Sequence, residues 1–192
     1  MPIYPLSPEN KWDRSYAMVM EAFEQAVSRH GAENIVVMGD SAGGGFALGL
    51  SQMLRNANKL LPGKLVLLSP YLDQTAADQT QEELEKTDVL ISIDGIRRLG
   101  SWWMREGEDP AMFPGSPLFE TVDRLPPMLV FAGSDEMLLA DSLRLKRKAD
   151  EIGAEIELKI YDRMQHVWML LPIPEAKTAL SEIVEFLLAP KV

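Results

Sequence analysis

The chain has 192 residues, 46% of them hydrophobic, which is enough for one domain with a sizeable core. Its net charge of −10 and the lack of any long basic run exclude the electrostatic footprint of a nucleic-acid-binding protein and disfavour anionic membranes. The absence of cysteine excludes disulfides, thiolate chemistry and Cys-based zinc sites. Neither a secretory signal nor an apolar run of membrane-spanning length is present, so we expect a cytoplasmic protein.

Apolar patterns predict helices and strands that alternate along the chain. In order, they are a helix over 13–28, a strand over 35–38, a helix over 42–58, a strand over 64–68, a helix over 94–105, a strand over 128–132, a helix over 137–152, a strand over 155–161 and a helix over 175–188. This order predicts an α/β fold, with a mostly parallel sheet and helices on both faces. We expect a single domain over 1–192, in which the irregular segment 73–127 forms an insertion near the site.

A G-x-S-x-G motif follows the first predicted strand: Gly39-Asp40-Ser41-Ala42-Gly43, with Gly44 next. A serine between a buried strand and a helix is typical of the nucleophile elbow, a strained turn in which the residues two places either side of the serine must be small. The N–H of Ala42 would then serve as an oxyanion donor, and Asp40 would support the turn. A glycine-rich structural turn is the alternative, whereas no phosphate-loop pattern is present.

A serine nucleophile needs a histidine base, and the base needs a carboxylate. Asp135 follows the third predicted strand and His166 follows the fourth, so both lie at the same sheet edge as Ser41. The order serine, acid, histidine is that of α/β-hydrolases. Glu136 is the neighbouring rival for the acid, and Asp141 is expected on the following helix. The other histidine, His30, is expected to be a solvated residue at a helix end.

The segment 39–44 resembles the serine motif of the hormone-sensitive-lipase family of α/β-hydrolases, the bacterial acetyl esterase and carboxylesterase group. Other segments resemble that family in order: Tyr4-Pro5-Leu6-Ser7-Pro8-Glu9, Ser69-Pro70-Tyr71-Leu72-Asp73, Asp109-Pro110, Ser116-Pro117-Leu118, Gly133-Ser134-Asp135-Glu136 with Leu138, and His166-Val167. The resemblance covers essentially the whole chain. It implies Ser41 as nucleophile, Asp135 as acid, His166 as base and Ala42 as one oxyanion donor, with no cofactor or metal.

Family members also carry an H-G-G-G motif upstream of the serine, which supplies further oxyanion donors, and this sequence does not contain it. The chain begins about where the family's Y-R-L-A-P-E segment begins, so we expect a truncated α/β-hydrolase fold and a weak esterase. The strand over 35–38 would then have an uncovered apolar edge, which a second copy or a complementing chain would cover. A shortened reading frame is equally consistent with the sequence.

Two functions fit these observations. The leading hypothesis is a serine hydrolase that cleaves small acyl esters through Ser41, Asp135 and His166. The alternative is a catalytically weak or inactive hydrolase-fold module that binds a small molecule or a partner, as the plant gibberellin receptors of this family do. The complete set of triad residue types favours the enzyme, and the missing oxyanion motif favours the binding module.

Overall fold

The computed structural model describes residues 1–190. Its helices and strands are α1 (Trp12–His30), β1 (Val36–Asp40), α2 (Ala42–Asn56), β2 (Lys64–Leu68), α3 (Thr80–Leu84), α4 (Ile93–Trp103), β3 (Met128–Gly133), α5 (Leu139–Ile152), β4 (Ile156–Tyr161) and α6 (Pro174–Leu188). Three short 3-10 helices are η1 (Ala32–Asn34), η2 (Pro117–Phe119) and η3 (Trp168–Leu170). No helix within residues 1–190 is both long and apolar enough to cross a membrane.

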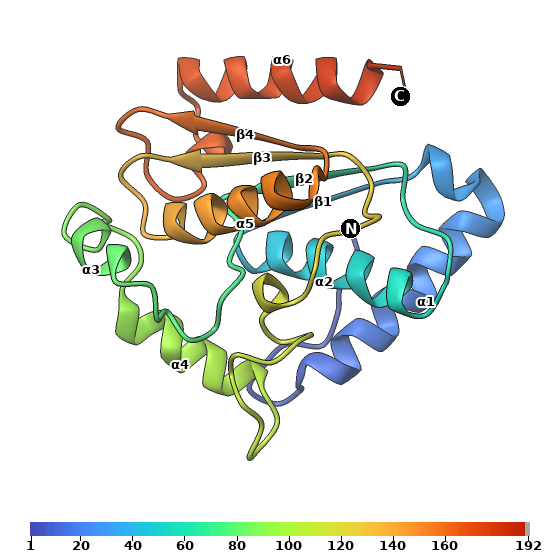
Figure 1. The fold of residues 1–192 in the computed structure, drawn as a ribbon, viewed down its shortest axis with the longest axis horizontal. Coiled ribbons are helices and arrows are strands. Elements are labelled where there is room, and N and C mark those ends of the chain that lie inside the picture. The colour runs from blue at the N-terminus through green and yellow to red at the C-terminus, as the bar shows by residue number, and fades with distance from the viewer. Residues whose placement is uncertain (191–192) are drawn as a thin grey trace.

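The four strands form one parallel sheet in the order β1-β2-β3-β4 (Figure 1). Val36 pairs with Lys64, and Met128 pairs with both Leu65 and Ile156, so the register runs continuously across the sheet. All strands therefore end at one edge, where open α/β sheets gather their functional residues. The predicted α/β fold with a parallel sheet is confirmed.

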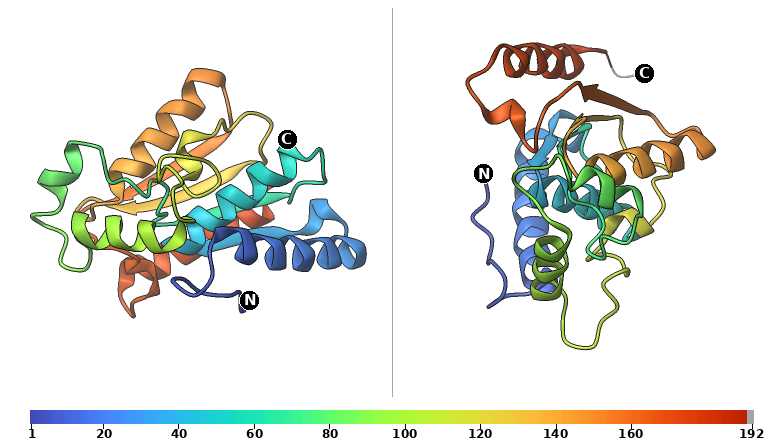
Figure 2. Two further views of the ribbon diagram at one scale, coloured as in Figure 1. Left: turned by 90° about the horizontal axis from the view of Figure 1, so that it is seen from below. Right: turned by 90° about the vertical axis from the view of Figure 1, so that its left-hand side faces the viewer.

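Helices cover both faces of the sheet, as predicted. On β2, Leu65 and Leu67 belong to a core that includes residues of α2 and α5, whereas Val66 and Leu68 belong to a core with α6. This division follows from the strand period of two residues. Figure 2 shows α6 alone on its side of the sheet, with the other long helices on the opposite side.

Aromatic side chains join the amino-terminal segment to α2. Tyr16 of α1 stacks on Phe46 of α2 with ring centroids 4.2 Å apart, and Tyr4 stacks on the same ring at 4.8 Å. A Cβ at Gly49 would lie 2.0 Å from the Tyr16 hydroxyl oxygen, so glycine at this position permits the close approach of α1. The contact places Tyr4 and Tyr16 beside the start of α2.

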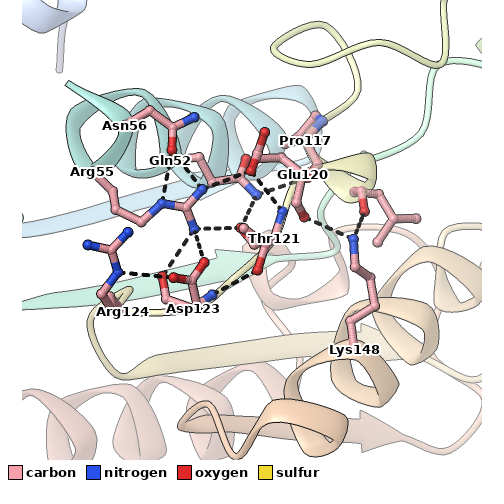
Figure 3. A network of polar contacts seen from close by, with 10 residues as sticks. Gln52, Arg55, Asn56, Pro117, Glu120, Thr121, Asp123, Arg124 and Lys148 are labelled. Atoms are coloured by element: carbon pink, nitrogen blue, oxygen red, sulfur yellow. Dashed lines mark hydrogen bonds and ion pairs between the residues drawn. The ribbon is translucent and has the colours of Figure 1, made fainter. Parts of the chain in front are cut away.

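A polar network anchors the segment between α4 and β3 to α2 (Figure 3). Arg55, only 5% exposed, donates hydrogen bonds to the carboxylates of Glu120 and Asp123, both at 3.0 Å. Gln52 donates to the carbonyl of Pro117 at 3.0 Å. Lys148 of α5 donates to the carbonyl of Glu120 at 2.9 Å. This network fixes η2 against α2, although only α4 was predicted as a regular element within 73–127.

β1 is an edge strand that pairs only with β2 within the described part of the chain. Two of its apolar side chains, Val36 and Met38, are 39% and 55% exposed. Met38 also lines an apolar groove with Leu171 and Leu180, beside α6. The predicted uncovered edge is therefore present in residues 1–190.

Candidate active site

Ser41 lies in a sharp turn between the end of β1 and the start of α2. Its φ of 51° and ψ of −120° place a non-glycine residue in a strained backbone region. The Ser41 N–H donates to the carbonyl of Leu68 at 2.9 Å, and the Ser41 carbonyl accepts the N–H of Tyr71 at 3.0 Å. These two bonds tie the turn to β2 and to the loop that follows it. The turn has the geometry of a nucleophile elbow.

The glycines of the motif differ in what they contribute. A Cβ at Gly39 would lie 2.2 Å from the carbonyl oxygen of Gly43, and a Cβ at Gly44 would lie 2.8 Å from Pro70 Cβ. By contrast, a Cβ at Gly43 would have no atom of residues 1–190 within 4 Å, apart from its chain neighbours and the backbone of its own helix. The expectation that Gly43 must be small for lack of space is therefore wrong. The position that requires a residue without a side chain is Gly39, because the backbone of Gly43 lies against it.

His166 lies between Ser41 and a buried carboxylate. It follows β4, is 8% exposed, and its Nε2 lies 2.9 Å from the Ser41 Oγ. The next residue, Val167, has a positive φ of 51° and donates its N–H to the Ser69 Oγ at 3.1 Å. The loop after β4 is thus fixed to the end of β2, which holds the imidazole against the elbow. The structure brings Ser41 and His166 together as predicted.

The carboxylate beside His166 belongs to Glu136, not to Asp135. Glu136 Oε2 lies 2.9 Å from His166 Nδ1, and Glu136 Oε1 accepts the N–H of Gly133 at 2.8 Å. Glu136 is fully buried, whereas the half-buried Asp135 accepts a hydrogen bond from the Ser134 hydroxyl at 2.8 Å. The expectation that Asp135 lies beside His166 is corrected, because the turn after β3 places Glu136 at hydrogen-bond distance from Nδ1 and leaves Asp135 bonded to Ser134.

A sequence signal for Glu136 exists in the residues that follow it. A continuous buried run follows it, formed by Met137, Leu138, Leu139 and Ala140. Glu136 stands directly before this run and is buried with it. The position nearer the strand end favours Asp135, whereas the buried run that follows favours Glu136. Strand ends predict the region of a catalytic carboxylate, and the turn decides which side chain faces inward.

The other predicted site residues lie where the sequence suggested. Asp40 is exposed in the elbow, and His30 is exposed at the last position of α1. Asp141 lies on α5, where its Oδ2 accepts the N–H groups of Leu72 and Asp73, both at 3.0 Å. Within residues 1–190, none of these three forms a hydrogen bond or ion pair with His166.

Ala42 is the first residue of α2, so its N–H has no acceptor within the helix. It follows Ser41 directly, at the helix end where the dipole favours negative charge.

Tyr4 approaches the elbow from the amino-terminal segment. Partial burial, and then the negative charge of Asp40, raise the pKa of the Tyr4 hydroxyl above its usual value, so this hydroxyl stays protonated. The Ala42 N–H and the Tyr4 hydroxyl are therefore both uncharged hydrogen-bond donors near Ser41.

A cavity of about 370 Å³ opens beside Ser41 and His166. Most of its lining is apolar. Its walls come from the amino-terminal segment, α2, the loop after β2, the segment around α4, and η2. The lining residues include Tyr4, Leu6, Ala42, Phe46, Tyr71, Leu90, Ile91, Ile96, Leu99, Trp103 and Pro117. An apolar group attached to a carbonyl at Ser41 would fit this environment. Within residues 1–190 no cluster of His, Asp and Glu side chains is arranged to hold a metal ion.

The parallel sheet, the strained elbow serine and the Ser41–His166–Glu136 series together define an α/β-hydrolase. Residues 1–170 match the model of a protein family described as alpha/beta hydrolase fold, and the chain belongs to this family. Of curated relatives, an esterase from Acinetobacter venetianus is 35% identical over 187 residues, which covers 95% of this chain and 61% of the relative. An acetyl-hydrolase from Streptomyces hygroscopicus is 30% identical over 155 residues, covering 80% and 52%.

Solved structures agree with this assignment. A structure from Staphylococcus aureus has a TM-score of 0.96 and 31% identity, covering all of this chain and 65% of the other. An esterase from the bacterial hormone-sensitive lipase family has a TM-score of 0.91 and 30% identity, covering 96% and 63%. The predicted resemblance to this group of esterases is confirmed. The chain spans between about half and two thirds of the length of these four relatives.

Proposed function

We propose that the chain is a serine hydrolase that cleaves small carboxylic esters, with Ser41 as nucleophile, His166 as base and Glu136 as the orienting acid. The observation that carries the proposal is the position of His166, whose two ring nitrogens lie 2.9 Å from Ser41 Oγ and from Glu136 Oε2. A hydroxyl is a poor nucleophile unless a base removes its proton. The names of the relatives, esterase and acetyl-hydrolase, favour the same reaction.

In the first half of the proposed reaction, Ser41 Oγ attacks the ester carbonyl carbon and its proton passes to His166 Nε2. The carbonyl oxygen gains a negative charge in the tetrahedral intermediate, and the Ala42 N–H donates to it. When the intermediate collapses, the carbon–oxygen bond to the alcohol breaks. The alcohol leaves with the proton from Nε2, and the acyl group stays on Ser41.

In the second half, a water molecule attacks the acyl carbon and gives one proton to His166 Nε2. The bond from the acyl carbon to Ser41 Oγ then breaks, and the proton returns from Nε2 to Oγ. The carboxylic acid leaves and the enzyme is restored. Throughout, the ionised Glu136 carboxylate accepts a hydrogen bond from the Nδ1–H of His166, which keeps Nε2 facing Ser41 and stabilises the imidazolium.

The test is hydrolysis of p-nitrophenyl acetate by the purified chain beside its Ser41→Ala variant, with the molecular mass determined on the same samples. We expect the wild type to release p-nitrophenol and to bind a fluorophosphonate probe covalently, and the variant to do neither. Ser28→Ala is the matched control, because Ser28 is an exposed serine on α1. Equal rates for wild type and Ser41→Ala would refute the proposal and favour the non-catalytic binding module.

We further propose that another chain, either a second copy or a complementing polypeptide, covers the β1 edge. The exposed apolar side chains Val36 and Met38 support this, since an unpaired apolar strand edge is a template for further pairing. A chain in that position would lie beside β1, the strand that leads into Ser41, and could supply further oxyanion donors. Light scattering after size-exclusion chromatography tests the proposal, and a strictly monomeric species that is fully active would contradict it.

The proposed organisation is one α/β-hydrolase domain over 1–192 in the cytoplasm, with 73–127 as the insertion over the site. The two cores on either side of the sheet favour a single domain, because each draws on β2 and β3. Limited proteolysis tests this organisation: a single domain should be cleaved first in 73–127, without release of a separately folded half.

A further inference from the structure

One wall of the cavity is formed by a short irregular segment between α3 and α4. Leu90, Ile91 and Ser92 from this segment line the same cavity as Ser41 and His166. The segment lies on the side of the molecule where the strands end (Figure 1). Val89 and Leu90 are 78% and 63% exposed, so little packing from outside holds the segment in place. We define residues 87–92 as the pocket wall.

Gln165 ties the pocket wall to the histidine loop. Its Oε1 accepts the N–H of Val89 at 3.1 Å, and its Nε2 donates to the carbonyl of Thr87 at 3.0 Å. The amide thus satisfies one donor and one acceptor of the wall backbone at once. Because Gln165 immediately precedes His166, these two bonds join the wall to the backbone that carries the imidazole.

Asp88 ties the same wall to the turn that carries the acid. Its Oδ1 accepts the N–H groups of Leu90 and Ile91 at 2.8 Å and 2.9 Å, which shapes the wall itself. Its Oδ2 accepts the N–H of Met137 at 2.8 Å. Met137 immediately follows Glu136, and Ile91 packs against the cluster that contains Met137. The wall is therefore fixed to both chain segments that hold His166 and Glu136.

We infer that Gln165 and Asp88 are positioning residues that couple the pocket wall to the alignment of His166 with Glu136. The inference rests on the proposed ester hydrolysis and adds a determinant of its selectivity. Within residues 1–190, neither side chain forms a hydrogen bond or ion pair with the side chains of Ser41, His166 or Glu136. An acyl group that extends into the cavity and packs on Leu90 or Ile91 thereby stabilises the arrangement of the triad, whereas an acetyl group leaves the wall largely unused.

Two substitutions break the two ties separately. Gln165→Ala removes both hydrogen bonds to Thr87 and Val89. Asp88→Asn retains the oxygen that accepts the N–H groups of Leu90 and Ile91, but places an amide N–H₂ opposite the N–H of Met137, where two donors meet. Gln165→Glu retains the acceptor for Val89 and loses the donor for Thr87, so it provides an intermediate between wild type and Gln165→Ala.

The experiment measures kcat and KM for p-nitrophenyl acetate and p-nitrophenyl hexanoate on all variants. We expect Gln165→Ala and Asp88→Asn to lower the hexanoate-to-acetate ratio of kcat/KM about threefold to tenfold, the range expected for one or two hydrogen bonds. A rise in KM for hexanoate and a smaller fall in kcat for both esters should accompany this change. Gln165→Glu should recover part of the ratio.

Gln25→Ala and Asp150→Asn are the matched controls, because both side chains are exposed on helices, Gln25 on α1 and Asp150 on α5. A merely structural role would reduce activity on both esters by the same factor and leave the ratio unchanged, which would overturn the inference. If the wild type shows no Ser41-dependent hydrolysis of either ester, the proposed function fails and the coupling fails with it. An active wild type with an unchanged ratio in every variant refutes the coupling alone.

Discussion

His166 Nδ1 lies 2.9 Å from Glu136 Oε2, although Asp135, one residue earlier, stands closer to the end of β3. The Gly133 N–H holds the other oxygen of Glu136 at 2.8 Å, so the carboxylate is fixed at both ends inside the core. A carboxylate held in this way can keep the imidazole in one tautomer and one orientation. Substitutions of Glu136 and of its neighbour Asp135 can therefore be compared directly to test which of the two is the acid.

We predict that Glu136→Gln lowers kcat for p-nitrophenyl acetate by about 10²-fold to 10⁴-fold, since an amide cannot stabilise the imidazolium and can favour the wrong tautomer. Asp135→Asn should change kcat by less than about threefold, because its carboxylate contacts Ser134. Steady-state kinetics on the two variants, with circular dichroism to confirm folding, distinguishes the roles. A larger loss for Asp135→Asn than for Glu136→Gln would reverse the assignment.

The elbow offers a second pair of contrasting substitutions. Gly39→Ala should lower the free energy of unfolding by about 2–4 kcal/mol, because its Cβ would lie 2.2 Å from the Gly43 carbonyl oxygen. Gly43→Ala should be neutral or stabilising by up to about 1 kcal/mol, since it lies in the first turn of α2 and its Cβ has space. Urea denaturation measures both. Equal destabilisation by the two alanines would contradict the geometry of the turn.

Removal of the Arg55 side chain tests the polar network of Figure 3. We predict that Arg55→Ala lowers the free energy of unfolding by about 2–4 kcal/mol, because Glu120 and Asp123 lose their buried cationic partner. The partial exposure of these two carboxylates limits the loss, since water can solvate them. Arg29→Ala, at an exposed position near the end of α1, is the control and should change stability by less than about 0.5 kcal/mol.

The fold was predictable because its signals are local. The range 64–68 predicted for the second strand is the range of β2, and the start of α2 at Ala42 follows from the elbow pattern. Short α3 was not predicted, because five residues provide too little periodicity to identify a helix.

The site was predictable to the level of the segment. Ser41 and His166 are placed by the strand ends that precede them, so a topological rule was sufficient to find both. The choice between Asp135 and Glu136 depends on the side toward which a turn points, and that side is set by tertiary packing. The roles of Asp88 and Gln165 depend on hydrogen bonds between segments far apart in the chain, such as that from Gln165 Nε2 to Thr87, which no local pattern reveals.

We expect Asp141 to make the stability of the protein depend on pH. Burial, and then the negative charge of Asp73, raise the pKa of Asp141 from its ordinary value of 3.8 to about 7. Between about pH 4 and pH 7 we therefore expect the folded state to hold a proton on Asp141 that the unfolded chain releases. The stabilisation associated with that proton is fully present below about pH 4 and is lost as the pH rises to about 7.

We predict that the free energy of unfolding of wild type, minus that of Asp141→Asn, falls as the pH is raised from about 5 to about 8. The steepest part should approach 1.4 kcal/mol per pH unit, the limit of about one proton. Urea denaturation of both proteins across this range measures the difference. Asp150→Asn, which removes an exposed carboxylate from the same helix, controls for the change in net charge. A difference that stays constant with pH would show that Asp141 is ionised in the folded state throughout, with Arg144 rather than a proton balancing its charge.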